Sequence, residues 1–123
     1  TLVTDFGVAH LVSHYQLHTL DISNTQVTDA GVRILAEGCR DLKNLDLTGL
    51  AVSDAGLIEL AGKCPRLEVL AVQSCEGVTD AGALQLAQLC PRLNMLYLLY
   101  TKVTAAGCAR LRAAFPALFV GWH

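Results

Sequence analysis

The chain has 123 residues, of which 53% are hydrophobic and 16% are charged. This composition excludes a disordered chain, and the length predicts one domain with one hydrophobic core. The formal net charge of -2 offers no basic surface to a phosphate backbone, so we expect no nucleic-acid partner. Gly, Pro or a charged residue interrupts each apolar run before it reaches the roughly 18 residues of a membrane helix, so we expect no membrane span.

One motif recurs along the whole sequence. The stretch "VTDAGVRILAEGC" at 27–39 returns as "VSDAGLIELAGKC" at 52–64 and as "VTDAGALQLAQLC" at 78–90. Glycines mark a common phase at intervals of 24 to 26 residues: Gly7, Gly31, Gly56, Gly82 and Gly107. A period of this length predicts a solenoid, in which each copy packs on the next.

The first copy, residues 1–16, lacks its strand. Val8, Leu11, Val12 and Tyr15 form an apolar helical stripe with no cap before it. We therefore expect further repeats or another subunit to cover this uncapped N-terminal end.

Each later copy opens with a short strand and continues into a helix. The strand reads leucine, two variable residues, leucine, one variable residue and an aliphatic residue, which places one side of the strand inward. These residues are Leu17, Leu20 and Ile22; Leu42, Leu45 and Leu47; Leu67, Leu70 and Val72; and Leu93, Leu96 and Leu98. Thr28, Ser53 and Thr79 are the expected N-caps of the helices that follow, each with an Asp in the first turn.

The last copy departs from the pattern. Ala105 replaces the Asp, Phe115 replaces the Cys, and Arg112 stands where the other copies carry Ala. We interpret the end of the chain as a cap. The predicted divisions of this single array are a partial repeat at 1–16, repeats at 17–41, 42–66, 67–92 and 93–117, and a C-terminal cap stub at 118–123.

These repeats resemble the cysteine-containing class of leucine-rich repeats, as found in F-box proteins. The resemblance rests on the leucine strand, the "VTDAG" helix start and the Cys-Pro-x-Leu exit, and it covers essentially the whole chain. It implies an α/β fold: a right-handed leucine-rich-repeat solenoid, a horseshoe segment with a short parallel concave sheet and convex helices. No F-box segment lies in these residues.

The cysteines and histidines do not favour a chemical site. Cys39, Cys64 and Cys90 share one inward helix phase, and neighbouring parallel helices lie too far apart for a disulfide. Packing thiols indicate a reducing compartment: cytoplasm or nucleus first, cilium or organelle interior as alternatives. His10 and His14 could share a metal, but such a pair is more often solvated surface. We expect no metal, no cofactor, no small-molecule substrate and no enzymatic activity.

The variable residues of the strands form the candidate binding surface. They fall in three rows: Thr19, Asn44, Val69 and Met95; Asp21, Asp46, Ala71 and Tyr97; and Ser23, Thr48, Gln73 and Leu99. Each row turns apolar toward the C-terminus, which predicts an interface hot region. The candidate partner-binding residues are Val69, Met95, Tyr97, Leu99, Tyr100, Asp21, Asp46 and Asn44. The alternative is that Phe119 and Trp122 fold over this patch.

Two functions follow from the resemblance and the surface. The first is a non-catalytic protein-protein interaction module, similar to the substrate-recognition arm of an F-box ubiquitin ligase receptor, with protein partners on the concave face and at the N-terminal end. The alternative is a permanent scaffold subunit of a large assembly, such as a ciliary axoneme complex or an organellar ribonucleoprotein or respiratory complex.

Overall fold

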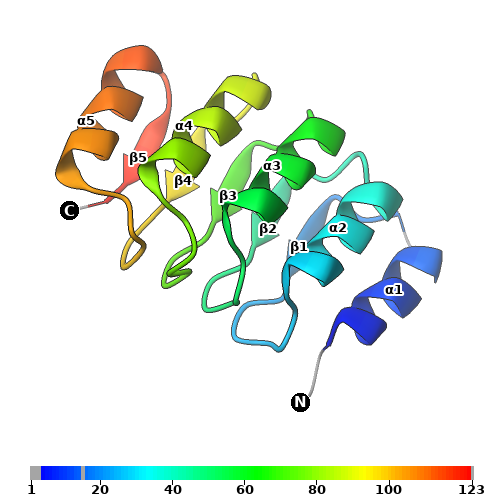
Figure 1. Cartoon of the computed structure of the whole chain (residues 1–123). Coiled ribbons are helices and arrows are strands. Elements are labelled where there is room, and N and C mark those ends of the chain that lie inside the picture. The colour runs from blue at the N-terminus through cyan, green and yellow to red at the C-terminus, as the bar shows by residue number, and fades with distance from the viewer. Residues whose placement is uncertain (1–3, 15, 123) are drawn as a thin grey trace.

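The computed structural model describes residues 4–14 and 16–122, and within them helices and strands alternate along the chain. The helices are α1 (Asp5–His14), α2 (Asp29–Gly38), α3 (Asp54–Lys63), α4 (Asp80–Leu89) and α5 (Ala105–Ala114). The strands are β1 (Thr19–Asp21), β2 (Asn44–Asp46), β3 (Val69–Ala71), β4 (Met95–Tyr97) and β5 (Phe119–Gly121). All five strands form one parallel sheet in chain order, and the helices stand side by side on one face of it (Figure 1). The expected α/β solenoid with a parallel sheet is confirmed.

The core lies between the sheet and the layer of helices. The middle residue of each strand points into this core, and Leu45, Leu70 and Leu96 are fully or almost fully buried. The helices contribute the predicted stripe, with Leu35, Leu60 and Leu86 buried at equivalent positions. Each repeat therefore covers the apolar side of its neighbour, as stacking in one dimension requires.

A carboxylate joins each helix start to the next repeat. Asp5 accepts hydrogen bonds from the backbone N–H and hydroxyl of Thr28, and Asp80 does the same for Thr104. Asp29 accepts the same two hydrogen bonds from Ser53, and Asp54 accepts them from Thr79. The predicted N-caps are in place, but Ser53 and Thr79 make no side-chain capping bond to their own helix.

The repeat-phase glycine makes room for this carboxylate. A methyl group on Gly56 would overlap Asp29, and the same relation holds between Gly31 and Asp5, Gly82 and Asp54, and Gly107 and Asp80. The letters Thr/Ser-Asp-Ala-Gly therefore encode a contact between repeats in addition to a helix start. The first residue of α5 cannot make this contact, because Ala105 has no carboxylate.

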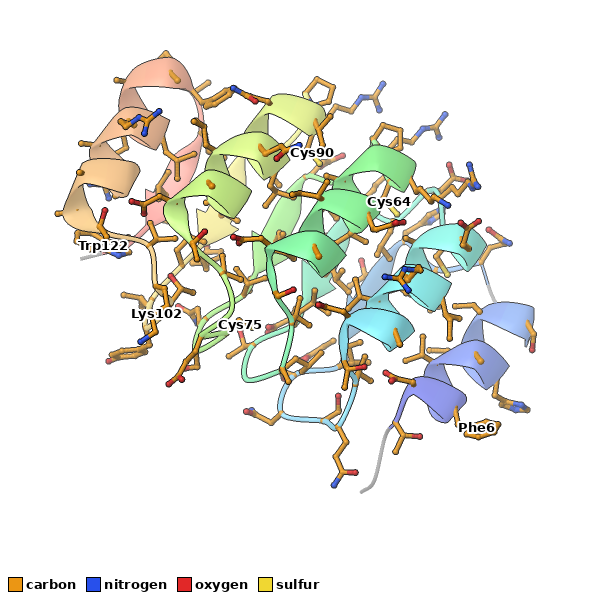
Figure 2. All side chains as sticks on the ribbon, in the orientation of Figure 1. Phe6, Cys64, Cys75, Cys90, Lys102 and Trp122 are labelled. Atoms are coloured by element: carbon orange, nitrogen blue, oxygen red, sulfur yellow. The ribbon has the colours of Figure 1, made fainter. Side chains whose placement is uncertain are left out.

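The first helix buries part of its predicted apolar stripe within the array itself. Val8 is buried and Val12 packs against the core, and the expected cover of the N-terminal end by further repeats or another subunit stays a prediction. This burial arises because α1 packs on α2, where a side chain at Gly38 would collide with Val12. The outward apolar residue of α1 is Phe6, which is 89% exposed (Figure 2). Tyr15 lies outside the described residues.

The C-terminal segment is a strand and not a stub alone. Phe119–Gly121 pairs in parallel with β4, with Phe119 opposite Met95 and Val120 opposite Leu96. The leucine pattern did not predict this strand, because the last copy is one residue shorter. Val120 follows Leu118 by two positions, whereas the equivalent Leu96 follows Leu93 by three.

Two side chains donate hydrogen bonds to backbone carbonyl oxygens at the C-terminal end of the described residues. Arg112 donates to the carbonyl oxygen of Val120 at 2.9 Å, on the last strand of the described sheet. The Trp122 indole donates to the carbonyl oxygen of Val103 at 3.0 Å, whereas the equivalent Val78 carbonyl accepts from the Lys102 backbone N–H. Figure 2 shows Trp122 beside the segment that leads into α5. Trp122 therefore packs at the end of the array and does not fold over the sheet.

None of the described helices is long and apolar enough to cross a bilayer.

Candidate functional site

The outward face of the sheet is built from two rows of side chains in register. The pairing of neighbouring strands aligns Thr19, Asn44, Val69, Met95 and Phe119 in one row, and Asp21, Asp46, Ala71, Tyr97 and Gly121 in the other. We call these two rows the sheet face. The first four members of each row were predicted from the sequence, and the strand pairing confirms their alignment.

One end of the sheet face is apolar and aromatic. Met95 is 41% exposed and Phe119 is 54% exposed, while Tyr97 and Val69 are half-buried. The rings of Tyr97 and Phe119 lie 5.8 Å apart at 58°, a tilted arrangement, and the Tyr97 hydroxyl contacts the Met95 sulfur at 3.6 Å. We call Val69, Met95, Tyr97 and Phe119 the apolar end. Its side chains hold one another in place while they remain open to solvent.

The opposite end of the sheet face is acidic and polar. Asp21 and Asp46 pair in register on β1 and β2, and each uses Oδ1 to accept a 2.9 Å hydrogen bond from a backbone N–H two residues later. These bonds come from Ser23 and Thr48. Hydrogen bonding from Ser23, through its side chain first and then its backbone, holds the pKa of Asp21 below its ordinary value. Asn44 donates to the Thr19 hydroxyl at 3.2 Å, so this amide is anchored between strands.

A shallow cavity of about 240 Å³ connects the two ends of the sheet face. Its walls include the acidic pair Asp21 and Asp46 and the apolar residues Val69, Ala71 and Tyr97. The side chain of Ala71 is small, and it lies between Asp46 and Tyr97 in the second row. The small side chain of Ala71 therefore leaves a depression in this row, between the Asp46 carboxylate and the Tyr97 ring.

The turn after β4 carries the remaining predicted residues. Leu99 is half-buried, and Tyr100 is 75% exposed. Tyr100 adopts a backbone φ of 62°, in the left-handed region that Asn24, Gly49 and Ser74 occupy at the same phase of their repeats. A bulky residue is unfavourable in this conformation, because its Cβ crowds the following carbonyl.

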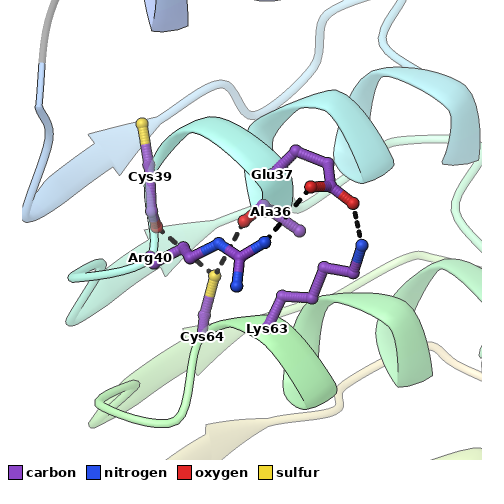
Figure 3. A network of polar contacts seen from close by, with 6 residues as sticks. All are labelled: Ala36, Glu37, Cys39, Arg40, Lys63 and Cys64. Carbon is purple, nitrogen blue, oxygen red and sulfur yellow. Dashed lines mark hydrogen bonds and ion pairs between the residues drawn. The ribbon is translucent and has the colours of Figure 1, made fainter.

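The cysteines occupy structural positions. All five are buried thiols outside any disulfide, and the Cys64 thiol donates to the carbonyl oxygen of Cys39 at 3.4 Å (Figure 3). Burial raises the pKa of Cys64 and of Cys90 to about 11, which keeps both thiols protonated near neutral pH. Figure 3 also shows Glu37 paired with Arg40 and Lys63 on the outer side of the helices. The thiols of Cys64 and Cys75 therefore form hydrogen bonds between neighbouring repeats.

A family model described as leucine-rich repeat matches residues 17–36, which span β1 and the start of α2. The same strand and helix recur in register through the rest of the structure. This segment is similar to a leucine-rich repeat, and the chain has the α/β solenoid fold that such repeats form. No curated protein matches its sequence.

The repeat fold brings most of the predicted binding residues onto one face. Asn44, Asp21 and Asp46 lie at its acidic end and Val69, Met95 and Tyr97 at its apolar end, whereas Leu99 and Tyr100 lie in the adjoining turn. Phe119 was not among the predicted binding residues, because it entered only in the alternative that it folds over the patch with Trp122. The signal was available, because the alternation of Leu118, Val120 and Trp122 places Phe119 outward.

Proposed function

We propose that this leucine-rich repeat array is a non-catalytic protein-protein interaction module that binds its partner through the sheet face. The observation that carries the proposal is the clustering of exposed apolar groups: Met95, Phe119 and Tyr100 lie on β4, on β5 and in the turn after β4. Exposed apolar and aromatic side chains gathered on one surface are typical of interaction sites. Repeat solenoids commonly offer such extended binding surfaces.

A finer version of this proposal is the substrate-recognition arm of an F-box ubiquitin ligase receptor. Its support is the resemblance of the cysteine-containing repeats at Cys39, Cys64 and Cys90. The ligase adaptor should then copurify with the native protein, and native protein purified without the adaptor would contradict this version.

A permanent scaffold subunit is the second candidate. Phe6 favours it, because this ring is 89% exposed on α1, at the opposite end of the array from the apolar end. An assembly that covers both ends would bury both groups. In that case native protein should elute only in a large complex on gel filtration, at every dilution tested.

The sheet face is tested by a matched pair of variants. Met95 is 41% exposed on the sheet and Leu89 is 40% exposed on α4, so Met95→Ser and Leu89→Ser remove similar apolar groups from opposite faces. In a pull-down from native extract with mass spectrometry, we expect Met95→Ser to lose proteins that the wild type and Leu89→Ser retain. Equal capture by all three proteins would contradict the proposal.

Melting temperatures control for folding in this pair. Met95 is outside the core, so we expect both variants to melt close to the wild type. A large decrease for Met95→Ser alone would indicate that the apolar end stabilises the array, which would also contradict the proposal.

A further inference from the structure

We infer that the sheet face binds an extended polypeptide segment carrying a basic side chain and, about four residues away, an apolar or aromatic one. The inference rests on the proposed function and specifies the chemistry of the partner. The basic side chain would meet Asp21 and Asp46, and the apolar one would lie on Met95, Tyr97 and Phe119.

The acidic end has charge that the described part of the chain does not neutralise. The ion pairs of the described residues use the carboxylates of Glu37 on α2, Glu59 on α3 and Asp41 in the loop after α2, and none involves Asp21 or Asp46. Paired strands lie about 4.8 Å apart, so the register places two negative charges on adjacent strands of the sheet face. A cation from a partner would find two acceptors there.

The shape of the sheet face fits a long basic side chain in particular. The cavity of about 240 Å³ reaches from the two carboxylates to Tyr97, and the small side chain of Ala71 leaves space between them. An Arg or Lys can lay its aliphatic stem beside the Tyr97 ring and over Ala71, and place its charged group at Asp46. The carboxylates also disfavour a nucleic-acid occupant, because they would repel its phosphates.

The spacing follows from the dimensions of a sheet. From the midpoint between β1 and β2 to the midpoint between β4 and β5 there are three strand intervals, about 14 Å at ~4.8 Å each. An extended chain advances about 3.4 Å per residue, so about four residues cross this distance. A segment that crosses the strands can therefore engage both ends at once.

The experiment selects ligands without assuming a partner. A randomised decapeptide display library is panned on the immobilised full chain, and enriched peptides are synthesised for fluorescence anisotropy. We expect enriched peptides to share a basic residue and an apolar or aromatic residue about four positions apart, in either order. Enrichment of peptides without a basic residue would overturn the inference.

Paired charge variants then test the acidic end. Asp21→Asn with Asp46→Asn should weaken peptide binding at least tenfold, whereas Asp41→Asn with Glu59→Gln removes the same charge from the helix side and should leave binding within about twofold. Circular dichroism should stay unchanged in the first variant and the melting temperature close to that of the wild type, because Asn keeps an Oδ1 that can accept from the backbone N–H groups of Ser23 and Thr48. Binding that resists the first variant, or that falls equally in both, would overturn the inference.

The outcome also separates this inference from the proposed function. If Met95→Ser abolishes peptide binding and the paired Asp variant does not, the sheet face is a binding surface without the basic preference. If neither variant affects the selected peptides, or if panning enriches no peptide, both the inference and the proposed function fail.

Discussion

Asp29, the first residue of α2, holds the start of the next helix through Ser53. Its Oδ1 accepts a 2.8 Å hydrogen bond from the Ser53 backbone N–H, and its Oδ2 accepts one from the Ser53 hydroxyl. The two residues are 24 positions apart in sequence and belong to consecutive repeats. A helix-start residue of one repeat therefore supplies the acceptor for a helix start in the next.

Asp29→Ala should consequently lower the free energy of unfolding by about 1–2 kcal/mol, because it leaves a partly buried N–H without its acceptor. Urea denaturation measures this loss. Asp41→Ala is the control, since its pair with Arg66 at 3.3 Å is exposed on both sides and should contribute less than about 1 kcal/mol. Equal losses in the two variants would show that the contact between repeats adds nothing beyond a charge.

Two glycines of α3 should respond to alanine in opposite directions. A methyl group at Gly56 would overlap the Asp29 carboxylate, whereas Gly62 has open space around its Cβ position. Gly62→Ala should raise the free energy of unfolding by about 0.5–1 kcal/mol, because alanine restricts the unfolded chain and favours the helix. Gly56→Ala should lower it by about 1–3 kcal/mol, the usual cost of overpacking. Stabilisation by both substitutions in thermal unfolding would refute the role assigned to Gly56.

Asp80 makes stability depend on acid pH. Hydrogen bonds from the Thr104 hydroxyl first, and then from its backbone N–H, lower the pKa of Asp80 from 3.8. A carboxyl with a lowered pKa in the folded state stabilises the fold above its unfolded pKa, and it loses this contribution as the pH falls through the folded value. We expect the contribution to be complete at pH 7 and to decline below about pH 4.

The measurement compares wild type with Asp80→Asn by urea denaturation between pH 7 and pH 3. The variant should lose less stability over this interval, although Asp21 retains its own lowered pKa. Identical pH profiles would contradict the assignment to Asp80.

The sequence predicted what is periodic within one repeat. Leucine spacing gave the strands and their inward faces, and the alignment of copies gave the rows from Thr19 to Met95. It did not predict the partner of Asp29, because local rules place a first-turn carboxylate against its own helix, whereas its hydrogen bonds cross to Ser53. It also did not predict β5, since one missing residue before Val120 breaks the leucine phase.

Arg112 should stabilise the last strand of the described sheet. Its guanidinium donates to the carbonyl oxygens of Val120 and Trp122, at 2.9 and 3.4 Å. Arg112→Met keeps much of the stem and removes the donors, so we expect faster amide exchange in Phe119–Gly121 and a loss of about 1 kcal/mol. Arg110→Met, on the same helix, is the control and should leave this exchange unchanged. Unchanged exchange in Arg112→Met would contradict the capping role.

Tyr100 should be held in its turn at a cost in stability. With φ at 62° it shares a phase with Gly49 and Ser74, and glycine adopts this conformation without strain. Tyr100→Gly should therefore raise the free energy of unfolding by about 1 kcal/mol, and Ser74→Gly should stabilise the array in the same direction.

The two variants should differ in binding, because Tyr100 adjoins the apolar end and is 75% exposed. We expect Tyr100→Gly to weaken binding of the selected peptides at least threefold while Ser74→Gly binds as the wild type does. Stabilisation without any loss of binding in Tyr100→Gly would exclude this ring from the binding surface.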